Sequence, residues 1–139
     1  MLQYQRESLA RKVADVSDAD ARGPLVGSGT SLLWLIRHMA RAEMLWVVYR
    51  FAGKSIQLPV DGVRPSDVLA DAVRTYRSGW ERVDAVVAAS PSLDALCARS
   101  DGQTRVNLRW VLTHLLEETA RHAGHADILR ELLDGTTGR

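Results

Sequence analysis

The residues best suited to chemistry lie within residues 107–133, a stretch whose pattern predicts a single helix. Three of the four histidines of the chain fall here, His114, His122 and His125, and Glu118 lies among them. A helix turns by about 100° per residue, so all three histidines lie within roughly 40° of Glu118 around the helix axis. Four side chains that can bind a metal ion therefore share one narrow stripe of this helix.

The spacing of Glu118 and His122 is that of a metal-binding pair. The two residues are four positions apart, about 6 Å along a helix, and both can reach one ion from the same face. A carboxylate and neutral imidazoles suit zinc, iron, nickel or manganese. Three protein ligands would leave positions open for water or substrate, as in reactive sites. The alternative is that these residues are only polar side chains on a solvated helix face.

The fourth histidine, His38, lies in the apolar segment 31–51, which predicts a buried helix. A buried imidazole needs a polar partner. Its helical neighbours one turn away include no acidic residue: Trp34, Leu35, Arg41 and Ala42. Its partner must come from another segment, from water or from a metal. We hypothesise that His38 meets the stripe of Glu118, His122 and His125 across a helix bundle and completes a metal site.

Other reactive or bulky side chains have simpler interpretations. Arg109, at the start of the same helix, could bind an anionic substrate group, but a solvent-facing arginine explains it equally well. Cys97 has no local signal of a nucleophilic cysteine–histidine pair, and a small buried role is favoured. The four tryptophans recur at helical core spacing, which favours packing over a cage for substrate: Trp34, Trp46, Trp80 and Trp110.

Four helical segments are needed to position these residues. Their apolar periodicity, together with caps at Ser31, Ser66 and Asn107 and a stop at Gly135, predicts helices over residues 2–16, 31–51, 66–89 and 107–133. Residues 54–65 contain prolines and a glycine without periodicity, which indicates a long crossover loop. The chain is therefore expected to be all-α, a four-helix bundle with a long crossover between helices two and three.

Composition limits the functional classes. A chain of 139 residues suits one domain over residues 1–139, and 46% apolar with 25% charged residues is typical of a globular protein. The net charge of +1, without a basic run, argues against nucleic acid as a partner. The single cysteine and the absence of a signal peptide at the N-terminus suit the cytoplasm. Charged residues interrupt the longest apolar runs, so no membrane span is expected.

Two segments carry a resemblance to a known family. Residues 28–43, SGTSLLWLIRHMARAE, and residues 108–135, LRWVLTHLLEETARHAGHADILRELLDG, resemble the DinB-like superfamily of four-helix metalloproteins, in its branch of short actinobacterial domains. The superfamily binds a divalent metal through a histidine of the second helix and an HxxxH or ExxxH pair of the last long helix. The resemblance implies that His38, Glu118 and His122 take these roles. His125 replaces a frequent glutamine and could be a fourth ligand, a substitute for Glu118, or a base.

The resemblance also implies an activity. Relatives such as mycothiol-dependent maleylpyruvate isomerase and the bacillithiol transferases use the metal to activate a low-molecular-weight thiol, and many members are homodimers. We therefore expect a divalent-metal-dependent S-transferase or isomerase acting on a low-molecular-weight thiol of the mycothiol type and an electrophile, with the electrophile in a pocket lined by the crossover loop. His125 and Arg109 are the expected catalytic residues. The alternatives are a non-catalytic bundle that binds metal or a small ligand, with a stress-related role, and a metal-free dimerisation module.

Overall fold

The computed structural model describes residues 1–100, 102 and 104–138. It contains five α-helices and one π-helical stretch, and no β-strand is found among the described residues. The elements are α1 (Leu2–Lys12), α2 (Asp18–Arg22), α3 (Leu32–Glu43), η1 (Met44–Phe51), α4 (Leu69–Ala88) and α5 (Leu108–Asp134). The prediction of an all-α fold is confirmed.

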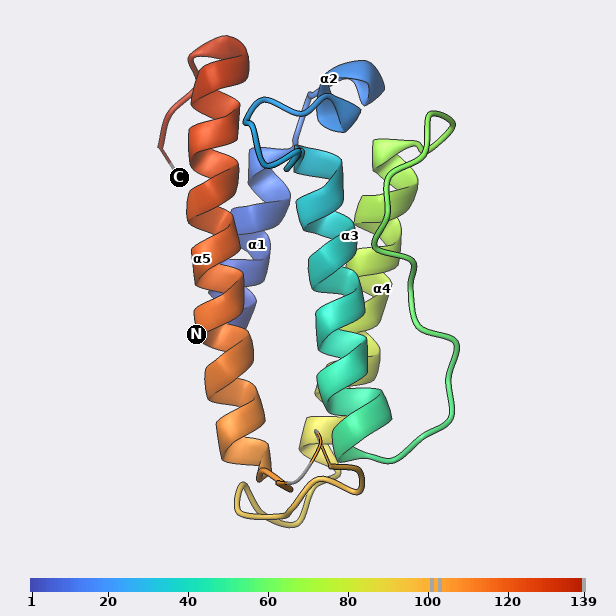
Figure 1. Ribbon diagram of the computed structural model, residues 1–139. Coiled ribbons are helices and arrows are strands. Elements are labelled where there is room, and N and C mark those ends of the chain that lie inside the picture. Colours follow the sequence, from blue (N-terminus) through green and yellow to red (C-terminus); the bar gives the residue numbers. More distant parts are fainter. Residues whose placement is uncertain (101, 103, 139) are drawn as a thin grey trace.

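The four long helical elements form a bundle in which α5 and α3 lie side by side, with α1 and α4 behind them (Figure 1). α1 packs against α5, and α3 packs against α4. The contact between α3 and α5 closes one face of the bundle. As predicted, the connection from η1 to α4 is a long crossover, which runs outside the bundle (Figure 1). Arg37 and Arg41 of α3 hold this crossover by donating hydrogen bonds to the carbonyl oxygens of Val60 and Pro59, at 3.0 and 2.9 Å.

Local capping signals fixed two of the predicted helix starts. The Ser31 side chain accepts a hydrogen bond from the Trp34 N–H, and the Asn107 side chain accepts one from the Trp110 N–H. Gly135, with a φ of 75°, ends α5 in the left-handed conformation that glycine adopts without strain. These caps place α3 and α5, which carry the candidate site residues, in the predicted register.

The start of α4 differs from the prediction. Ser66 is not its cap, because the helix begins at Leu69, and the Leu69 N–H donates to the carboxylate of Asp18 at 2.8 Å. The cap is thus supplied by α2, 51 positions earlier in the chain.

The first helix is also shorter than predicted: it ends at Lys12, and the chain then turns through Asp15, whose φ is 61°.

A π-helical stretch, η1, continues α3 and was not predicted. It begins directly after Glu43. This residue is 1% exposed, and its carboxylate forms a buried ion pair with Arg6 of α1. Arg6 Nη2 is 2.6 Å from Glu43 Oε2, and Arg6 Nε lies 3.0 Å from both carboxylate oxygens. The Arg6 guanidinium also reaches Asp84 of α4 at 2.9 Å, so this network joins three helices.

The apolar core fills the bundle on both sides of this ion pair. One part is built mainly from α3, the first half of α4, α1 and the C-terminal half of α5, and the other from η1, the end of α4 and the first turns of α5. Cys97, 1% exposed, belongs to the second part, as its predicted packing role requires. Among the described helices, none combines the length and apolar character that crossing a membrane requires.

Candidate metal centre

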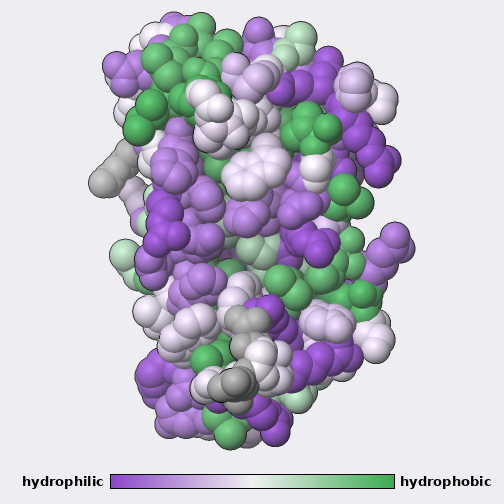
Figure 2. Space-filling model, in the orientation of Figure 1, coloured by the Kyte–Doolittle hydropathy of each residue, from purple (hydrophilic) through white to green (hydrophobic). Residues whose placement is uncertain are grey.

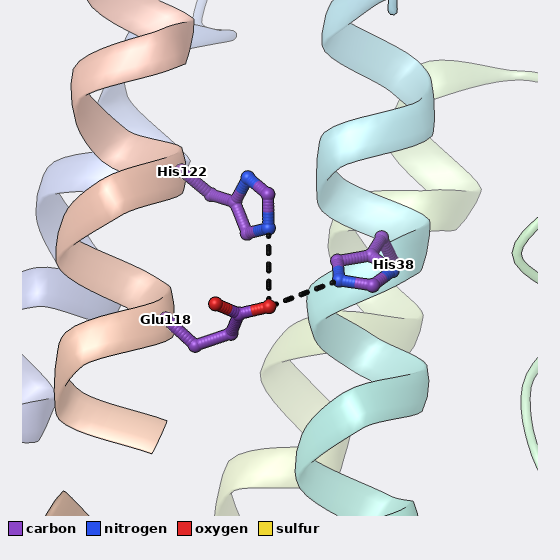
Figure 3. Close-up of side chains that lie close together, drawn as sticks. All are labelled: His38, Glu118 and His122. Atoms are coloured by element: carbon purple, nitrogen blue, oxygen red, sulfur yellow. Dashed lines mark ion pairs between the residues drawn. The ribbon is translucent and has the colours of Figure 1, made fainter. Parts of the chain in front are cut away.

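The contact between α3 and α5 brings together His38, Glu118 and His122, which we call the candidate cluster (Figure 3). One potential ligand atom from each residue lies within 4.8 Å of the other two. Nε2 of His38 and Nε2 of His122 face the same carboxylate oxygen, Glu118 Oε1, at 3.8 and 3.5 Å. Each side chain is partly accessible, with 26%, 19% and 10% exposed for His38, Glu118 and His122. A small molecule could therefore approach the cluster from outside.

The donor set fits a divalent transition metal. Ligand atoms about 2.1 Å from a tetrahedral ion lie roughly 3.4 Å from one another, so the observed separations need only small side-chain movements to close around one ion. Two imidazole nitrogens and one carboxylate oxygen are ligands that zinc, iron, nickel and manganese accept. The three residues come from two helices, which restricts their positions through the packing of the bundle.

The electrostatic surroundings favour a neutral His122. Burial lowers the pKa of the His122 imidazole, and the neighbouring His38 lowers it further, while Glu118 acts in the opposite direction. Only a neutral imidazole has the lone pair that a metal ligand needs. The local environment therefore keeps His122 in the protonation state required for binding an ion.

Trp34 forms part of the wall of the site. Its ring stacks on His38 with a centroid separation of 4.8 Å and an interplanar angle of 14°. It meets the ring of His122 edge to face, with the two centroids 6.2 Å apart. Sequence reasoning assigned this tryptophan to packing and missed its contact with the site. The signal was its position four residues before His38, which places the two rings on one helix face. The stack restrains the imidazole plane of His38.

Arg121 orients the carboxylate of Glu118 from outside the cluster. Arg121 Nη1 donates to Glu118 Oε2 at 2.6 Å, and the same guanidinium also pairs with Glu117. With Oε2 held in this way, Oε1 is directed toward the two histidines.

We expect Arg121→Ala to weaken metal binding about 10-fold without abolishing it, because groups that orient metal ligands typically contribute on this scale. The affinity can be measured by competition with a chromogenic chelator. Arg74→Ala, which removes an exposed ion pair on α4, is the control and should leave the affinity unchanged. An unaltered affinity in Arg121→Ala would show that Glu118 needs no such support.

His125 lies next to the cluster and outside it. Its Nδ1 is 3.3 Å from Nδ1 of His122, on the side of that ring opposite the nitrogen that faces Glu118. His125 is exposed, and the group of three potential ligands found among the described residues does not include it. Its role as a ligand or a base stays a prediction, while its position suits a contact that fixes the ring of His122.

The structure does not bring the other predicted residues to the cluster. Arg109 lies nine residues before Glu118, about 13 Å along the helix, and its exposed guanidinium pairs with Asp94 at 3.2 Å. His114 shares the stripe of α5, but its ring stacks on Trp110 at 5.0 Å and contacts Trp46 at 4.9 Å. Arg109 as an anion clamp therefore stays a prediction, with its side chain held by Asp94 in this conformation.

Two pockets near α3 and α5 differ in their relation to the cluster. A pocket of about 230 Å³ lies under the crossover, against Arg37, Val60 and Asp67, and none of the three cluster residues lines it. A second pocket of about 210 Å³ lies between α5 and the loop that joins α2 to α3. We call it the α2–α3 loop pocket, and its lining residues are Val26, Ser28, Thr30, His125, Ile128 and Leu129. It shares His125 with the surroundings of the cluster.

Comparisons with known proteins give a consistent picture. A family model described as mycothiol-S-transferase matches residues 1–135. No curated protein matches the chain. The crystal structure of a conserved protein from Enterococcus faecalis has a similar fold, with a TM-score of 0.68 over 97% of this chain and 94% of that one. The identity is 16%, so this likeness concerns the fold alone.

Proposed function

This chain belongs to the mycothiol-S-transferase family of the DinB-like superfamily, and on that premise we propose that it is a metal-dependent S-transferase. In this proposal His38, Glu118 and His122 hold a divalent ion, and mycothiol is the thiol that is transferred. The second substrate is a small electrophile. The observation that carries the proposal is the convergence of three potential ligand atoms within 4.8 Å of one another, from two helices, at an accessible face of the bundle.

The chemistry of the donor set supports a reactive site. A bound divalent ion would lower the pKa of a coordinated thiol, so that thiolate is present near neutral pH. The protein supplies three ligands, and this number leaves room for a further ligand from solution. His38 and His122 would each contribute one imidazole nitrogen, and Glu118 would contribute the single negative charge. Trp34 and Arg121 limit the movement of His38 and Glu118.

The proposed reaction is a substitution at carbon. The sulfur of the thiolate donates an electron pair to the electrophilic carbon and forms the carbon–sulfur bond. The leaving group departs with the electrons of the bond that breaks, and the thiol proton is released to solvent. The reaction needs no oxidant or reductant.

The test is a conjugation assay with protein that was expressed without a histidine tag. The metal-loaded chain is incubated with mycothiol and 4-nitrobenzyl chloride, and the S-conjugate is followed by mass spectrometry. We expect conjugation above the rate without protein, its loss after treatment with a chelator, and its return when the metal is restored. Glutathione in place of mycothiol is the control for thiol selectivity.

The alternative function is a bundle that binds metal without catalysis. It predicts stoichiometric metal together with a conjugation rate equal to that of the solution reaction. That result, obtained with zinc, nickel, iron and manganese in turn, would overturn the transferase proposal while leaving the candidate cluster intact. Absence of metal binding would overturn both.

Cys97 should not compete with the thiol substrate for an electrophile. Burial raises the pKa of the Cys97 thiol, although Arg105 and Arg50 act in the opposite direction, and the residue is 1% exposed. We expect less than about one-tenth of Cys97 to be alkylated by iodoacetamide at pH 7.5 in the time that fully alkylates the unfolded chain. Intact-protein mass spectrometry measures both. Rapid alkylation of the folded chain would contradict the burial of this thiol.

A further inference from the structure

We propose that the α2–α3 loop pocket binds the electrophile, and that it selects a compact, mainly apolar group the size of one substituted aromatic ring. The proposal rests on the transferase function above and assigns its second substrate to a place. It differs from the expectation of a site under the crossover loop, where the pocket has no lining residue in common with the candidate cluster.

The pocket adjoins the cluster through one side chain. His125 lines the pocket, and its Nδ1 lies 3.3 Å from Nδ1 of His122. The rings of the two histidines have centroids 5.3 Å apart. A group seated in the pocket therefore lies beyond the rings of His125 and His122, as seen from the ligand atoms that face Glu118. For a substitution reaction, an electrophile bound here must extend past His125, so that its reactive carbon comes within bonding distance of the sulfur.

The walls of the pocket favour an apolar occupant. Three of its six lining residues are aliphatic, Val26, Ile128 and Leu129. Its two hydroxyl groups, of Ser28 and Thr30, already hydrogen-bond to each other at 2.9 Å. A thiol carrying many polar groups would lose hydration here without gaining partners. An apolar electrophile would bury its surface against the aliphatic side chains, and one of the two hydroxyls or His125 could still bind a single polar substituent.

The size and exposure of the pocket agree with this assignment. Its volume of about 210 Å³ exceeds the roughly 150 Å³ that holds benzene in an engineered protein cavity. Ile128 is 56% exposed and Val26 is 36% exposed, so two of the aliphatic side chains that line the pocket are open to solvent. The space-filling view shows hydrophobic surface at this upper end of α5 (Figure 2). An occupant would cover these side chains.

The kinetic test compares two electrophiles with the same leaving group, 4-nitrobenzyl chloride and the smaller, polar chloroacetamide. In Ile128→Ser we expect kcat/KM for 4-nitrobenzyl chloride to fall about 5- to 10-fold, because part of the apolar contact is lost. The value for chloroacetamide, the KM for mycothiol and the metal content should stay within about 2-fold. Leu132→Ser is the matched control, an exposed leucine one turn further along α5 and outside the pocket lining.

A binding test works without turnover. The unreactive 4-nitrobenzyl alcohol is titrated into the ¹⁵N-labelled metal-loaded chain, and amide shifts are followed by NMR. We expect the largest shifts at Ser28, Thr30 and Ile128, and weaker binding in Ile128→Ser.

Two results would overturn the assignment. One is an equal loss, or no loss, for both electrophiles in Ile128→Ser. The other is a set of NMR shifts that is absent or centred under the crossover at Val60 and Asp67. If no electrophile is conjugated by the wild type, the transferase proposal fails, and the NMR titration still decides whether this pocket binds an apolar ring.

Discussion

His122→Ala is expected to remove the metal from the protein. In the wild type we expect one divalent ion per chain, held by His38, Glu118 and His122, whose ligand atoms lie within 4.8 Å of one another. Removing one of three protein ligands should lower the affinity by more than about 100-fold, since even groups that only orient ligands contribute 10- to 100-fold. Elemental analysis of the untagged proteins, after gel filtration, measures the ion directly. Conjugation of mycothiol should fall with it to the rate without protein.

A matched control lies on the same helix. His114→Ala removes a histidine of the same stripe whose ring packs on Trp110 and Trp46, and this variant should keep its metal. His38→Ala should lose metal as His122→Ala does, because His38 is the ligand that α3 contributes to the cluster. Metal retained in both His38→Ala and His122→Ala would place the ion elsewhere. Arg121 is unsuitable as a control, because it holds the carboxylate of Glu118.

The second large effect is on stability. Arg6→Ala should lower the free energy of unfolding by roughly 3–5 kcal/mol at pH 7, since it leaves the carboxylate of Glu43 buried without its partner. Glu43 is 1% exposed and receives three contacts of 3.0 Å or less from the Arg6 guanidinium. Urea denaturation of the metal-free chain, followed by circular dichroism, measures the loss. Circular dichroism suits the measurement because the described fold is helical.

The loss should depend on pH in a defined direction. Burial raises the pKa of the Glu43 carboxyl above its usual value, and Arg6 opposes this in the wild type. Without Arg6 the folded state prefers the protonated acid, so its stability falls as the pH rises above the pKa of the unfolded chain. The difference between Arg6→Ala and the wild type should therefore be smaller at pH 5 than at pH 7.

A paired substitution separates charge from packing. Arg6→Met with Glu43→Leu should recover most of the loss, because well-packed apolar residues can replace a buried ion pair at little cost. A loss in Arg6→Ala that does not change with pH would show that the missing contacts of the arginine side chain dominate, and would contradict the electrostatic explanation.

The parts of the fold that depend on local sequence were predictable. Ser31 and Asn107 cap helices whose first turns they precede, and the apolar periodicity of α3 and α5 follows from their contact with the core. The parts that depend on distant contacts were not. Asp18 caps α4 from another helix, and the buried network of Arg6 requires three helices to be in place. No local pattern in Met44–Phe51 indicated a π-helix.

The same distinction applies to the candidate site. Helical spacing related Glu118 to His122, and the lack of acidic neighbours around His38 indicated that its partner came from elsewhere. The structure gives that partner as Glu118. The spacing could not separate His125 or His114 from the cluster, because the side that a histidine ring faces depends on the residues packed against it. Arg109 lies on the same helix as Glu118, but nine residues along the helix axis separate the two side chains.

The packing of α1 against α5 has a consequence for how the chain acquires its structure. α1 contacts α5 extensively, and these helices lie near opposite ends of the chain, so part of the bundle depends on contacts between residues more than 90 positions apart. During synthesis α1 emerges long before α5, and the part of its surface that packs against α5 stays uncovered until α5 is made. Contacts of such long range slow folding relative to helical proteins built from neighbouring helices. The candidate cluster, which also needs α5, forms only when this late step is complete.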